Sequence, residues 1–157
     1  MTFATLSQYF EKLEATSSRL ALIDILSELF SHVKSDEIGM VAYLLQGRVA
    51  PLYEPLEMGM SEKLVAAALA KAYGSTKDQV LKLYGKLGDM GLVASKLASH
   101  PERAKRVEGS RLSVEAVFKV LTEIARTTGD GTVEKKVKML AGLLEKMDGI
   151  SAKHLVR

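Results

Sequence analysis

The chain has no cysteine and no tryptophan, and only 6% of its 157 residues are aromatic. The absence of cysteine excludes disulfide bonds, thiolate metal sites and cysteine nucleophiles, and it fits a reducing, intracellular environment. So few aromatic side chains are poorly suited to the core of a β-sandwich or a β-barrel. The composition therefore favours an aliphatic core built from helices.

Long hydrophobic runs are also missing. No segment approaches the roughly 18 consecutive apolar residues of a membrane helix. The N-terminal sequence MTFATLSQYFEKLE has no basic segment followed by an apolar one. We therefore expect neither a membrane segment nor a cleaved leader. The length fits a single domain over residues 1–157, large enough to bury about two thirds of the surface of the unfolded chain.

Apolar residues recur at helical spacing in four segments, and each segment predicts a helix with one buried face. The four stripes run from Leu22 to Val33, Val80 to Leu87, Val114 to Ala125 and Val133 to Met147. Together with the shorter segments between them, they predict an all-α, compact domain of about nine helices.

Polar residues mark expected helix starts. Thr76 and Gln79 have the spacing of a capping box, and Thr132 is placed to cap the helix that follows a Gly-Asp-Gly turn. Further starts are expected at serines, namely Ser35, Ser61, Ser113 and Ser151. The segment Pro51–Pro55 predicts a non-helical connection, because proline lacks an amide hydrogen and disfavours a helical residue before it.

Charge is unevenly distributed along the sequence. Residues 1–60 carry four Lys or Arg against eight Asp or Glu, a net charge of −4, whereas the remainder carries eighteen against eleven, a net charge of +7. The basic part would attract a polyanion, since neutralising phosphates releases counterions. An ordinary solvated helical surface rich in lysine explains the same pattern.

Three blocks of sequence are more distinctive than the helical segments around them. They are LLQGRVAPLYEPLEMGMSEKL at 44–64, KLGDMGLVA at 86–94 and IARTTGDGTVEKK at 124–136. In this order they resemble the N-terminal DNA-binding domain of ATP-dependent DNA ligases of the archaeal and eukaryotic type. The resemblance extends from about Phe10 to Arg157.

The resemblance implies a domain of two related helical halves, with Arg19 and Lys136 opening corresponding helices. It implies that the whole protein seals nicks in double-stranded DNA during replication, repair and recombination, with ATP and Mg²⁺ as cofactors. This chain would grip nicked duplex DNA from the minor-groove side, without sequence preference and without catalysis or cofactors of its own. The nucleotidyltransferase and OB-fold domains lie outside it, and the chain ends before a Gly-Lys-Leu-Arg loop that the family places at the minor groove.

The start of the last long helix is the favoured DNA contact. Thr132, Lys135 and Lys136 present a hydroxyl, two ammonium groups and the first-turn amides of one helix, which suits one or two adjacent phosphates. Arg19 occupies the related position in the first half, where a guanidinium group can hold a phosphate or enter a minor groove. A cation is poorly placed for the dipole at a helix start, which favours a functional reason for Arg19.

Two further positions have alternative explanations. Gly88 and Gly91 would let a DNA backbone approach the amides of the following helix, but they also suit an ordinary turn between helices. Arg48 would bind a phosphate, or it would close the turn over Glu54 or Glu57.

The string Lys146-Met147-Asp148-Gly149 resembles the Lys-x-Asp-Gly motif in which ligases form a lysine adenylate. We interpret it as a decoy, because only eight residues follow it and no nucleotide pocket can be assembled around them. A lysine near a helix end and a glycine that terminates the helix explain the string equally well. The three histidines share no metal-ligand spacing, so no metal site is expected.

Two other functions compete with DNA binding. A helical protein-interaction module would dock a partner on the acidic first third, and a nucleotidyltransferase would act through Lys146. The basic loop at 99–110 could touch phosphates but is more often merely solvated. It lacks the glutamine and aromatic pair with which some ligases bind the sliding clamp, so the clamp remains a partner only for the full-length protein. We expect an intracellular, nucleoid-associated protein.

Overall fold

In a computed structural model of the chain, residues 1–100 and 112–157 are described. This part of the chain forms nine α-helices and a single isolated β-bridge, between Thr2 and Ser113. The all-α prediction is therefore confirmed. The helices are α1 (Phe3–Glu14), α2 (Arg19–His32), α3 (Ile38–Leu45), α4 (Glu62–Tyr73), α5 (Lys77–Leu87), α6 (Met90–Ala98), α8 (Val114–Arg126), α9 (Thr132–Leu144) and α10 (Gly149–Val156). None of these helices has the length and apolar character needed to cross a bilayer.

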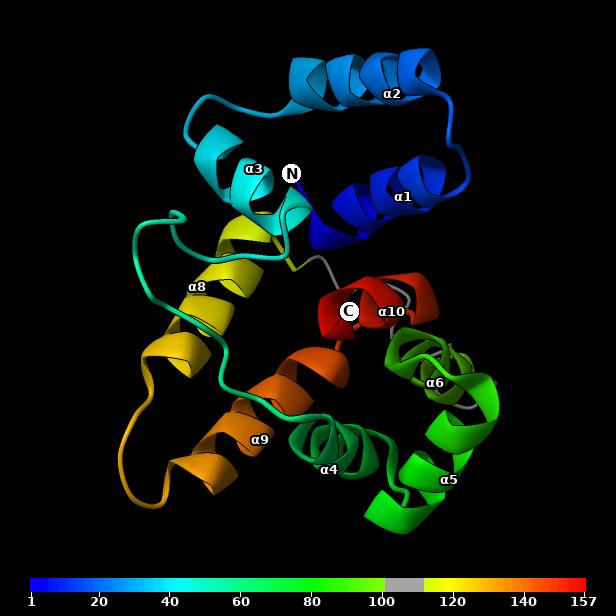
Figure 1. Cartoon of the computed structure of the whole chain (residues 1–157), viewed down its shortest axis with the longest axis vertical. Coiled ribbons are helices and arrows are strands. Elements are labelled where there is room, and N and C mark those ends of the chain that lie inside the picture. The colour runs from blue at the N-terminus through cyan, green and yellow to red at the C-terminus, as the bar shows by residue number, and fades with distance from the viewer. Residues whose placement is uncertain (101–111) are drawn as a thin grey trace.

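The helices form two groups that meet at α10 and also where α8 packs against α9 (Figure 1). Helices α1, α2, α3 and α8 make one group, and α4, α5, α6 and α9 make the other. Helix α10 lies between them and packs against both α6 and α1, while α4 packs along α9. The first residues of the chain join α8, because the Val114 amide donates to the Met1 carbonyl at 3.0 Å. That the two groups are related halves stays a prediction.

The core is aliphatic, as the composition predicts. Its largest fully buried side chains are Leu6, Leu29, Leu69, Ile124 and Leu144. The predicted stripe of α8 is buried at Val114, Val117, Leu121, Ile124 and Ala125. Helix α2 differs, because only Leu29 is buried in it and Leu20 is 75% exposed. Its apolar residues surround the whole helix, so spacing alone could not define a single buried face.

A pocket of about 240 Å³ lies where the two groups meet. Its walls come from both groups and from the connection between α3 and α4, including Phe3, Val49, Met58, Leu140 and Leu155. Most of this lining is apolar, so the pocket belongs to the packing between the two groups of helices.

The capping pattern confirms some predicted helix starts. Thr76 and Gln79 form the full capping box of α5, and the Ser113 hydroxyl accepts from the Ala116 amide at 3.1 Å at the start of α8. Ser61 precedes α4, but its side chain makes no capping hydrogen bond.

Three predicted starts were wrong by a few residues. Helix α10 begins before Ser151, because the Asp148 carboxylate is the stronger cap and accepts from the Ser151 amide at 2.8 Å. Gly149 accordingly begins α10 instead of terminating α9. Helix α3 begins at Ile38 instead of near Ser35. Thr132 is the first residue of α9 instead of its cap, since Gly131 takes the cap position with a φ of +74°.

Close packing of α6 against α10 generates a test of stability. A Cβ on Gly91 would lie 2.7 Å from the Lys153 carbonyl oxygen, so Gly91→Ala forces the two helices apart. We expect a loss of about 1–3 kcal/mol in the free energy of unfolding, measured by urea denaturation.

Gly85→Ala is the matched control. Gly85 lies within α5 and has no atom within 4 Å of an added Cβ, so the substitution should stabilise the helix by about 0.5–1 kcal/mol. Equal effects of the two substitutions would contradict the packing role of Gly91.

Candidate nucleic-acid interface

The start of α9 is shaped by the turn that precedes it. Gly129 and Gly131 have φ values of +106° and +74°, a backbone region that favours glycine. No side chain caps the first turn of α9, so its amides are not occupied by a capping oxygen. The Thr132 hydroxyl instead donates to the Gly129 carbonyl at 2.8 Å. The predicted hydroxyl is therefore at the helix start, but it already takes part in holding the turn.

The two adjacent lysines of α9 differ in environment. The Lys135 side chain is 58% exposed and lies 3.5 Å from the Glu123 carboxylate of α8. This exposed ion pair is weak and can be exchanged for a phosphate at small cost. Lys136 is only 8% exposed, and its Nζ donates to the Met58 carbonyl at 3.0 Å. The expected pair of exposed ammonium groups is thus reduced to one.

Arg19 begins α2, as predicted, and its side chain is exposed. It makes no hydrogen bond or ion pair with the described residues. Lys138 on α9 and Arg126 on α8 are also exposed and also make no hydrogen bond or ion pair with the described residues. Sequence reasoning did not select these two residues. Because α8 and α9 pack together, these cations add to the charge around Lys135. For Lys138, three positions after Lys135 on the same helix, spacing was the available signal, but spacing cannot show which charges lack partners.

The Gly88–Gly91 block joins α5 to α6, as expected. Gly88 ends α5 with a φ of +71° and is exposed. The Asp89 carboxylate then caps α6 and accepts from the Leu92 amide at 2.7 Å. Gly91 is buried against α10. A negative cap on the first turn of α6 makes this start less suited to a phosphate than the start of α9.

Arg48 lies at the base of the connection between α3 and α4. Its guanidinium donates to the carbonyls of Ala50 and Pro51 at 3.3 and 3.4 Å. It therefore closes the turn, but through backbone oxygens and not through Glu54 or Glu57 as the sequence suggested. The backbone turn brings carbonyls to the guanidinium, which sequence alone does not reveal.

The predicted contacts do not form one cluster. Figure 1 shows α2, the start of α9 and the α5–α6 turn in different parts of the molecule. Thr132 and Lys135 share the start of α9, whereas Arg19 begins α2 and Gly88 ends α5. Their roles in DNA contact stay predictions.

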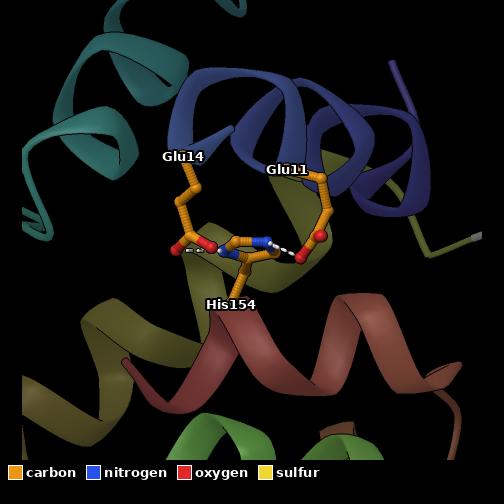
Figure 2. A group of neighbouring side chains, drawn as sticks. All are labelled: Glu11, Glu14 and His154. Carbon is orange, nitrogen blue, oxygen red and sulfur yellow. Dashed lines mark hydrogen bonds and ion pairs between the residues drawn. The ribbon is translucent and has the colours of Figure 1, made fainter. Parts of the chain in front are cut away.

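A cluster of charged residues that sequence reasoning missed joins the first helix to the last (Figure 2). His154 of α10 lies between two carboxylates of α1, with Nε2 at 2.8 Å from Glu11 Oε1 and Nδ1 at 3.8 Å from Glu14 Oε1. Lys153 bonds to both carboxylates, and Arg157 bonds to Glu14 and, at 3.0 Å, to Asp89. Figure 2 shows the histidine ring directed from α10 toward α1.

Each carboxylate of this cluster is stabilised in its charged form. The Lys153 ammonium lowers the pKa of Glu11 in spite of partial burial. Burial alone would raise the pKa of Glu14, but hydrogen bonds from Lys153 and Arg157 hold it below its ordinary value. Burial also opposes ionisation of Asp89, while the Leu92 amide and Arg157 bring its pKa below the ordinary range. These three carboxylates therefore stay ionised to a lower pH than carboxylates in water do.

Glu11, Glu14 and His154 also have the spacing of metal ligands, since their donor atoms lie within 4.8 Å of one another. Lys153 and Arg157 already neutralise the two carboxylates. A cation would have to displace both of these partners, so the residues fit an ion-pair cluster better than a metal site.

Lys146 follows the end of α9 and is exposed. The hollow beside Lys146 and Asp148 has a volume of about 10 Å³, room for roughly one water molecule. This is far too small for a nucleotide. The interpretation of Lys146 as a decoy remains a prediction. The basic loop with Arg103, Lys105 and Arg106 lies outside the described residues.

The nine described helices around an aliphatic core, with the exposed Lys135 and Lys138 on α9, define an all-α helical domain. Residues 2–157 match the family described as DNA ligase N terminus, and the chain belongs to that family.

Curated relatives are named as DNA ligases. A probable DNA ligase of Dictyoglomus turgidum is 42% identical over 157 residues, which cover this whole chain and 26% of the relative. DNA ligase 2 of Thermofilum pendens is 38% identical over 163 residues, which cover 27% of the relative. A DNA ligase of Aeropyrum pernix is 36% identical over 168 residues and 28% of its length. The chain thus spans about a quarter of the length of these relatives.

The charged cluster predicts a stability that depends on pH. A carboxylate whose pKa is lowered by folding stabilises the protein above its unfolded pKa, about 4.3 for glutamate. That contribution is lost as the pH falls through the lower folded pKa. We expect the Glu11→Gln/Glu14→Gln variant to be less stable than the natural chain at pH 7, and the difference to shrink toward pH 3. Urea denaturation at both pH values measures it.

Glu115→Gln is the control, because Glu115 is exposed on α8 and has no partner among the described residues. It should change stability little at either pH. A difference between the double variant and the natural chain that persists unchanged at pH 3 would argue against an ionic role for the cluster.

Proposed function

We propose that this chain is the non-catalytic, duplex-binding N-terminal domain of an ATP-dependent DNA ligase. The observation that carries the proposal is the match to the DNA ligase N-terminus family over residues 2–157. A ligase must hold both sides of a nick, and a helical domain that binds the phosphate backbone would supply affinity and position. Nicked double-stranded DNA is the substrate that fits this role.

The start of α9 supports the proposal most strongly within the chain. Its first-turn amides have no side-chain cap, and the exposed Lys135 is joined by the unpaired Lys138 and Arg126. Amides at a helix start and nearby cations favour phosphate oxygens. Thr132 can reach the same phosphate by giving up its bond to Gly129. Arg19, which has no partner in the described residues, is the second favoured contact.

Binding through phosphates should show no sequence preference. Low aromatic content leaves few side chains for stacking on bases, and exposed lysines recognise charge rather than base edges. Nick sealing itself, with ATP and Mg²⁺, would be carried out by the rest of a full-length ligase, where the relatives have three quarters of their length. Contact with a sliding clamp would also belong to the full-length protein.

One observation favours the alternative, a helical protein-interaction module. Leu52 and Tyr53 are 77% and 88% exposed on the connection between α3 and α4. Contact with another protein would remove these two adjacent side chains from water, which is favourable for apolar surface. A DNA-binding domain should bind duplex with an affinity that falls steeply with salt, whereas an interaction module should show little salt-sensitive binding to DNA.

The proposal is tested by fluorescence anisotropy of a labelled nicked duplex at several salt concentrations. We expect affinity to fall steeply with salt, and intact duplex of unrelated sequence to compete while single strand competes less. Lys135→Ala should weaken binding equally for all sequences and reduce the slope of log affinity against log salt by about one.

Lys34→Ala is the matched control. It removes the same charge from an exposed lysine in the acidic first part of the chain, so it should leave the slope unchanged. No salt-sensitive binding by the natural chain at low salt would exclude the proposed role for this chain and favour the interaction module.

A further inference from the structure

The connection between α3 and α4 is irregular in backbone but fixed at both ends. We call residues 49–60 the α3–α4 loop. Val49 and Ala50 are buried where it begins, and Met58 and Met60 pack against the core where it ends. At its tip the Glu54 amide donates to the Pro51 carbonyl at 3.1 Å, which closes a turn. The exposed Leu52 and Tyr53 occupy the centre of that turn.

Two cationic side chains hold the two ends of the loop. Arg48 donates to the carbonyls of Ala50 and Pro51 on the first side. Lys136 reaches from α9, 78 positions away from Met58 in sequence, and donates to the Met58 carbonyl on the second side. Together they bond to backbone oxygens on both sides of the exposed turn.

The surroundings of Lys136 are suited to holding the Met58 carbonyl. The residue as a whole is only 8% exposed, and no carboxylate of the described residues forms an ion pair with its ammonium. A buried cation without a counter-charge is costly unless polar groups compensate. Gly59 makes room for the ammonium, because a Cβ there would lie 2.9 Å from Nζ, and its φ of +58° is a backbone conformation that favours glycine. An exposed surface lysine would need none of these features.

We propose that Lys136 is a positioning residue, which fixes the α3–α4 loop and its Leu52–Tyr53 turn through the Met58 carbonyl. This role takes the place of the direct phosphate contact suggested by sequence. The neighbouring Lys135 then carries the DNA contact at this helix start. The division between the two lysines rests on the proposed function, but the positioning role itself does not.

The absence of cysteine makes a site-specific test simple. A spin label is attached to a single cysteine introduced by Tyr53→Cys, and its mobility is measured by electron paramagnetic resonance. We expect Lys136→Met to increase the mobility of this label, because methionine fills the volume but donates no hydrogen bond. A label introduced by Lys71→Cys, on the exposed surface of α4, should keep its mobility.

Lys135→Met is the matched control, since it removes the same charge from the adjacent residue and should leave both labels unchanged. Lys136→Arg keeps a cationic donor and should retain more order at position 53 than Lys136→Met does. Unchanged mobility at position 53 in folded Lys136→Met would overturn the proposal. If Lys136→Met does not fold, the Nζ signal of Lys136 in the ¹⁵N-labelled natural chain decides, since a fixed ammonium exchanges slowly and an unbound one does not.

Salt dependence of DNA binding separates positioning from phosphate contact. Lys136→Met should leave the slope of log affinity against log salt unchanged, whereas Lys135→Met should lower it by about one. A fall of about one in Lys136→Met would instead show a phosphate contact and overturn the proposal. If the natural chain binds no DNA, the proposed function fails, while the spin-label experiment still decides the role of Lys136.

Discussion

The contact between the first helix and the last holds this domain together. Lys153, His154 and Arg157 of α10 meet Glu11 and Glu14 of α1, and Arg157 also reaches Asp89 at the start of α6. One short helix of eight residues thus joins both groups of helices, with Gly91 allowing its close approach to α6. A helix of this length is unstable alone, so α10 depends on these contacts as much as the groups depend on it.

The same arrangement divides the charged residues by role. Those that bridge elements are paired: Arg157 with Asp89, and Lys153 with Glu11. Lys135 at the start of α9 and Arg19 on α2 are exposed, and they have a weak partner or none among the described residues. Paired charges stabilise the fold, and unpaired exposed cations remain available to a polyanion. Charge counts along the sequence cannot make this distinction, because it depends on which partners the fold brings together.

Much of the fold could be predicted from local patterns. The buried stripe of α8 and the capping box of α5 follow from residues three and four positions apart, and both are confirmed. Contacts between residues far apart in the sequence were not predicted. Its place at a helix start suggested that Lys136 is exposed. The residue is instead buried, and it donates a hydrogen bond to a carbonyl 78 positions away in the sequence. The α1–α10 cluster joins residues 139 to 143 positions apart, which spacing within either helix cannot indicate.

The proposed function places the uncapped start of α9 and Arg19 against duplex DNA, while α10 holds the two groups of helices together. The most direct test is to titrate a ¹⁵N-labelled chain with a short nicked duplex and follow the amide chemical shifts. The proposed function predicts large changes at Thr132 to Lys135 and near Arg19, with little change in the cluster of Glu11, Glu14 and His154. Changes confined to Leu52 and Tyr53, or none at saturating duplex, would contradict it.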